Sequence, residues 1–76
     1  MRINYYAVVL SNGYLMNVFT NRADAEERAG WINGGDFNGP EYETYNAEVV
    51  RGLSNIKSKA RGKFTVEQIK RMAFTN

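Results

Sequence analysis

The sequence contains neither cysteine nor histidine, and its 76 residues include a single proline. Without cysteine the chain has no disulfide and no thiolate nucleophile, and without histidine it lacks the side chain that most often serves as a catalytic base or a transition-metal ligand. Zinc fingers and iron–sulfur clusters are therefore excluded. We accordingly expect a protein that is not an enzyme and that binds no cofactor.

Long apolar runs are also missing. The longest uninterrupted run, residues 5–10, is far shorter than the roughly 20 residues of a membrane span. The first residues lack the charged start, apolar centre and cleavage site of a secretory signal. We expect a soluble, cytoplasmic protein with no membrane partner, and a chain of this length can build only one modest core.

Charge is unevenly distributed along the chain, although the net charge is only +2. Residues 1–50 carry three arginines against seven acidic side chains, whereas residues 51–76 carry seven basic side chains against one acid. The two ends of the molecule therefore have opposite electrostatic character, which favours different kinds of partner.

Two apolar segments around a turn signal predict a hairpin. Residues 3–10 have almost no polar interruption, which is typical of a strand at the centre of a sheet. Because Asn12 and Gly13 tolerate the positive φ angles of tight turns, residues 14–19 should return as an antiparallel strand.

The period of two over residues 42–50 predicts a third strand. Its inward side chains are expected to be Tyr45, Ala47 and Val49.

Capping residues indicate two helices. Asn21 can cap a helix over residues 22–32, whose acidic first turns suit the positive end of the helix dipole. Its apolar stripe consists of Ala25, Ala29 and Ile32. Thr65 and Gln68 form a capping box that opens a short helix over residues 66–74. The apolar face of this second helix consists of Val66, Ile69 and Ala73.

These elements predict a single α+β domain. We expect an antiparallel three-stranded sheet in the order 2-1-3, with the first helix on one face. The opposite face needs cover from the C-terminal helix or from another molecule. Residues 1–50 form the core of this arrangement, residues 51–64 an irregular or partly helical basic linker, and residues 65–76 the C-terminal helix.

An acidic, glycine-rich stretch separates the first helix from the third strand. Residues 33–40 are expected to form a loop, since their glycines and proline end helices. Oxygen ligands over residues 36–43 resemble a calcium loop only loosely, because the full ligand pattern is absent. Acid–base chemistry on a glycoside would need a cleft that so small a chain hardly offers. We interpret the stretch as a solvated loop without a metal site.

Aromatic residues make up 13% of the chain, more than its small core can hold. Tyrosine and tryptophan outside a core often anchor interfaces, because they bury a large area at low entropic cost. Trp31 lies off the apolar stripe of the first helix and next to the glycine-rich loop. The predicted protein-binding residues are Trp31, Asp36, Phe37, Tyr42 and Glu43.

The basic segment offers a second predicted contact. Its cationic residues are Arg51, Lys57, Lys59, Arg61 and Lys63. They could contact phosphates or an acidic protein surface, or simply be solvated. Only Phe64 lies within the run to stack on bases, so the segment carries little base-specific information.

The chain resembles accessory proteins of phages and mobile elements in three respects. These are its small size, its lack of cysteine and histidine, and its hairpin, helix and strand in close succession. Such proteins frequently cover a surface on a larger host protein. We therefore predict a non-enzymatic binding module that occludes or modulates a larger protein partner. The alternative is a small DNA- or RNA-binding protein that uses the basic segment, and an exposed strand edge could pair two copies into a homodimer.

Overall fold

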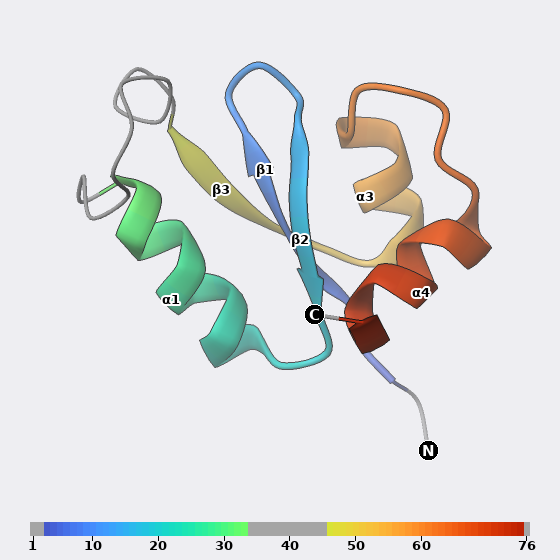
Figure 1. The fold of residues 1–76 in the computed structure, drawn as a ribbon, viewed down its shortest axis with the longest axis horizontal. Coiled ribbons are helices and arrows are strands. Elements are labelled where there is room, and N and C mark those ends of the chain that lie inside the picture. The colour runs from blue at the N-terminus through green and yellow to red at the C-terminus, as the bar shows by residue number, and fades with distance from the viewer. Residues whose placement is uncertain (1–2, 34–45, 76) are drawn as a thin grey trace.

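A three-stranded sheet lies between helices on both of its faces (Figure 1). The computed structural model describes residues 3–33 and 46–75. The strands are β1 (Tyr6–Leu10), β2 (Leu15–Phe19) and β3 (Ala47–Arg51). The helices are α1 (Arg22–Asn33), α3 (Leu53–Lys59) and α4 (Val66–Thr75). The strand order is β2-β1-β3 and both pairings are antiparallel, which confirms the predicted α+β fold and its 2-1-3 order.

The turn between β1 and β2 depends on Gly13. The amide of Gly13 donates to the carbonyl of Leu10 at 2.8 Å, and the side chain of Asn12 accepts from the amide of Tyr14 at 3.0 Å. Only Gly13 has a positive φ here, at 89°. The hairpin was predicted correctly, but its connection is a longer turn with one left-handed glycine, because Asn12 stays at negative φ.

A β-bulge sets the faces of β2. Successive β1 residues pair with Asn17 and Leu15, so that Met16 is an extra residue in the ladder. In a regular strand, Leu15 and Val18 would point to opposite faces. The bulge instead lets both become buried in the cluster beneath α3 and α4.

Strand β1 is central and contributes to a core on each side of the sheet. The cluster against α1 contains the buried residues Val8, Leu10, Ala25, Ala29 and Ile32. The cluster against α3 and α4 contains Tyr5, Ala7, Val9, Leu15, Val18, Ile56, Ala60 and Ile69. The alternating side chains of β1 explain why its sequence is apolar almost throughout, as predicted for a strand covered on both faces.

The far face of the sheet is covered by two helices. The C-terminal helix α4 covers it as predicted, with its Thr65–Gln68 capping box formed by hydrogen bonds of 2.9 and 3.1 Å. The predicted basic linker contains α3, which places Ile56 fully in the core. The apolar residues Leu53, Ile56 and Ala60 have helical spacing, which explains why this part of the linker folds.

The first strand is shorter than predicted, and the described part of the third strand ends one residue later than predicted, at Arg51. Tyr6 pairs with the last residues of both β2 and β3, Phe19 and Arg51, so residues 3–5 have no neighbouring strand to extend β1. Residues 42–45 of the predicted third strand, Tyr45 included, lie outside the described residues. In β3 Val49 packs on the α1 side as expected, and Val50 packs on the other side, since both faces are covered.

Side-chain amides occupy part of the outer edge of β3. The Asn33 side chain accepts a hydrogen bond from the amide of Ala47 at 2.7 Å and donates one to the same residue's carbonyl at 2.9 Å. The side chain of Asn55 donates to the carbonyl of Arg51 at 2.9 Å. These contacts satisfy edge groups that would otherwise be free to pair with another strand.

Candidate functional site

Helix α1 presents Trp31 to solvent. The helix is capped by Asn21, whose side chain accepts from the amide of Ala23 at 2.8 Å, as the sequence predicts. Its stripe of small residues packs on the sheet, and Trp31 projects away from that stripe with 43% of its surface exposed. The guanidinium of Arg28, one turn earlier, lies 5.0 Å from the centre of the indole ring. This stacking holds the ring beside a cation.

A hollow of about 130 Å³ adjoins the indole. It is lined by Phe19, Asp24, Glu27, Arg28 and Trp31, which we call the Trp31 surface. A second hollow of about 450 Å³ shares Phe19, Asp24 and Arg28 with it and reaches Ala73 on α4. Aromatic rings and charges of both signs therefore meet where α1 borders the end of β2.

The structure describes only one of the predicted protein-binding residues. Trp31 is exposed and lies off the buried stripe of α1, as the sequence indicates. The other predicted members, Asp36, Phe37, Tyr42 and Glu43, lie outside the described residues. The prediction did not include Phe19 or Arg28. Arg28 could have been predicted, because its spacing of three residues from Trp31 places both on one side of a helix. The approach of Phe19 depends on tertiary packing.

The other aromatic rings that the structure describes are divided between core and surface. Tyr5 is buried, and its ring meets that of Phe74 edge-to-face with 6.4 Å between the ring centres. Phe74 is nevertheless 64% exposed, and Tyr14 beside the hairpin turn is 57% exposed. The described rings are thus not all needed to fill the core, which is consistent with a contact role for some of them.

The predicted basic residues do not share one face. Lys57 and Lys59 both lie on α3, where residues two apart point about 200° away from each other. In an extended segment their alternation would have placed them on the same side. The Nζ of Lys59 forms an ion pair with Oε1 of Glu48 at 3.1 Å. Arg61 donates its backbone amide to the carbonyl of Gly13 at 2.7 Å, and its side chain is exposed, as is that of Lys63.

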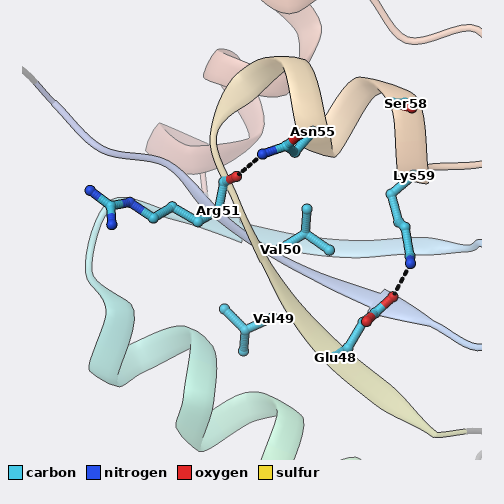
Figure 2. Close-up of a pocket in the computed structure, with 7 residues that line it drawn as sticks. All are labelled: Glu48, Val49, Val50, Arg51, Asn55, Ser58 and Lys59. Carbon is cyan, nitrogen blue, oxygen red and sulfur yellow. Dashed lines mark hydrogen bonds and ion pairs between the residues drawn. The ribbon is translucent and has the colours of Figure 1, made fainter.

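A groove of about 490 Å³ runs between β3 and α3 (Figure 2). It is lined by Glu48, Val49, Val50, Arg51, Asn55, Ser58 and Lys59. The Lys59–Glu48 ion pair lies at one end, and the Asn55–Arg51 hydrogen bond lies at the other. This groove was not predicted from the sequence, because it depends on the helical fold of α3.

Among residues 3–33 and 46–75, no cluster of three or more acidic side chains is placed to hold a metal ion. In the same part of the chain no helix has the length and apolar character needed to cross a membrane.

Comparisons with protein-family models, curated proteins and solved structures give no significant match. The fold defines a small α+β domain, and its function has to be inferred from its surfaces.

Proposed function

We propose that this protein is a small cytoplasmic binding module that recognises a larger protein through the Trp31 surface and occludes or modulates it. It carries out no catalysis itself. This mode of action is the one that its resemblance to phage and mobile-element accessory proteins implies. The observation that supports the proposal is the exposed indole of Trp31, which is stacked on Arg28 and adjoins a hollow.

The exposed part of Trp31 is large enough to anchor an interface. Tryptophan buries up to about 250 Å², and 43% of the residue is exposed, so about 100 Å² is available to a partner. At about 25 cal/mol per Å², covering this area contributes about 2.5 kcal/mol. That free energy corresponds to about a 70-fold change in affinity, the size expected of an interface hot spot.

Charges around the indole give the surface a preferred partner. Asp24 and Glu27 line the hollow together with Arg28. A partner with an apolar pocket for the ring and basic groups at its rim would complement both features. Such rim charges act mainly on the association rate, which should fall as salt is added.

The test is affinity capture from a lysate of the source organism with the wild-type chain and two variants. Trp31→Ala should lose the captured protein, because it removes the anchor from a site whose surroundings stay intact. Tyr14→Ala is the matched control, since it removes an aromatic ring that is even more open to solvent, on another part of the fold. Equal capture by wild type and Trp31→Ala would refute the proposal.

Nucleic-acid binding is the second candidate, and the exposure of Lys57, Arg61 and Lys63 favours it. Within the described part of the chain, no ion pair neutralises these side chains. Replacing them together with Lys59 by alanine should abolish retention of DNA or RNA and flatten its dependence on salt. Under our first proposal the same variant still captures its protein, and treatment of the lysate with nuclease leaves capture unchanged.

A further inference from the structure

The outer edge of β3 has free backbone groups between its two amide contacts. The carbonyl of Asn46 accepts from the amide of Ser11, and the amide of Gly52 donates to the carbonyl of Tyr5. Even-numbered β3 residues between them therefore turn their backbone groups toward β1. Odd-numbered residues face outward, as the contacts of Asn33 with Ala47 also show. Within the described residues, no partner occupies the amide and carbonyl of Val49 or the amide of Arg51.

Hollows flank this edge on both faces of the sheet. The groove of about 490 Å³ lies on the α3 side, and Figure 2 shows β3 lying between α1 and α3. A hollow of about 170 Å³ lies on the α1 side and is lined by Tyr6, Arg22, Glu26, Val49 and Arg51. Val49 and Arg51 line both spaces. An added strand would need room for side chains above and below the sheet, and the edge provides it.

The charge at this edge favours an acidic occupant. Glu48 is paired with Lys59 on the α3 side, and Arg22 is paired with Glu26 at 3.0 Å on the α1 side. The guanidinium of Arg51 forms no ion pair with the described residues. It is thus the uncompensated charge between the two hollows, and a carboxylate on an added strand could reach it.

We propose that the edge of β3 binds an extended, acidic peptide segment of a partner protein by strand addition. The segment would bond to the free groups of Val49 and Arg51, place apolar side chains against Val50 and place a carboxylate beside the Arg51 guanidinium. This site is separate from the Trp31 surface, so it can exist whether or not that surface has a partner.

A second copy of this chain fits the edge less well. A two-fold axis at Val49 would set Arg51 of one copy against Ala47 of the other, whose backbone groups Asn33 already occupies. An axis at Arg51 would place two guanidinium groups directly opposite each other, which is destabilising. An axis at Val50 would set the Val49 amide against the Arg51 carbonyl of the other copy, which already accepts from Asn55. Peptide addition meets none of these obstacles, since the segment can be short and supply the opposite charge.

The probe for this site is the peptide acetyl-Thr-Val-Glu-Val-Thr-amide, titrated into the ¹⁵N-labelled full chain. We expect the largest amide shifts at Val49 and Arg51, with slower hydrogen exchange of both amides and affinity in the millimolar range. Replacing the peptide's glutamate by lysine should weaken binding by about 3- to 10-fold, because it removes an exposed charge pair and also places two cations side by side. Arg51→Glu, which keeps the backbone amide, should reverse this preference.

Methylation of the peptide backbone tests the strand geometry. In an extended peptide, alternate amides point to opposite edges, so only one of the two alternate sets can bond to β3. N-methylation of that set should abolish binding, and N-methylation of the other set should leave it nearly unchanged. Equal effects of both peptides would overturn strand addition.

Three further results would overturn the proposal. The first is no perturbation of Val49 and Arg51 up to about 10 mM peptide, which corresponds to a free-energy limit of about 3 kcal/mol. The second is a perturbation centred on Trp31 instead. The third is a shift of the two edge amides that depends on protein concentration in the absence of peptide. The last result would assign the edge to a second copy. Trp31→Ala should bind the peptide as the wild type does, which separates this proposal from the one made for the Trp31 surface.

Discussion

Replacing Asn33 by alanine should destabilise the fold, although Asn33 is exposed and contributes nothing to the core. Its side chain makes paired hydrogen bonds to both backbone groups of Ala47, at 2.7 and 2.9 Å. These contacts join the last residue of α1 to the first residue of β3, across the residues that separate the two elements. Losing them frees one end of the edge strand.

The magnitude follows from these hydrogen bonds. Each contributes about 0.5 to 1.5 kcal/mol, and because water can reach the freed groups of Ala47, we expect a total loss of about 1 to 2 kcal/mol. Alanine is also the better helix former, so part of the loss is offset. At about 0.05 to 0.15 kcal/mol per residue, the whole domain has about 4 to 11 kcal/mol of stability. The expected fall in Tm is about 5 to 15 °C.

The assay is urea unfolding followed by circular dichroism, with hydrogen exchange of the Ala47 amide as a local readout. Asn4→Ala is the matched control, because Asn4 is exposed and its side chain makes no hydrogen bond with the described residues. The Asn33→Ala variant should have a lower unfolding midpoint than Asn4→Ala and faster exchange at Ala47. Equal midpoints and unchanged exchange would show that the Asn33 contacts do not stabilise β3.

Three other substitutions test the fold. Gly13→Ala should cost more than about 1 kcal/mol, because φ is 89° and the new Cβ would lie 2.9 Å from Cβ of Arg61; an unchanged urea midpoint would contradict this turn. Thr65→Ala should cost about 1 kcal/mol and speed hydrogen exchange in the first turn of α4, with Gln68→Ala showing a similar change; protected amides would argue against the capping box. Ile69→Ala should cost about 2 to 5 kcal/mol, so a thermal transition close to that of the wild type would mean that Ile69 is not a core residue.

Local signals were sufficient to predict most of the elements. The capping residues Asn21 and Thr65 begin their helices as expected, because a cap acts on backbone amides within one turn. The hairpin at Gly13 was predicted for the same reason, since only the adjacent strands and the turn matter. The helix at Leu53–Lys59 was harder to predict, because its lysines and the nearby Gly52 and Gly62 favour a linker and its stability comes from burying Ile56.

The candidate sites were less accessible to prediction. The exposure of Trp31 follows from its position relative to the buried stripe of α1, which a helical periodicity shows directly. Its neighbour Phe19 comes from another element, and the groove beside Val50 exists only because α3 packs next to β3. Lys57 and Lys59 lie on a helix, so they point in different directions, which only the fold of α3 decides.

The sequence by itself determined the helix starts, the hairpin, the central place of β1 and the absence of thiol and imidazole chemistry. These depend on residue type and on periodicity over a few neighbours. Tertiary structure decided which faces the rings and charges occupy, and it decided that Asn33 and Asn55 leave Val49 open between them. The physical reason is that such groupings join residues far apart in the chain, whose approach is set by core packing on both sides of the sheet.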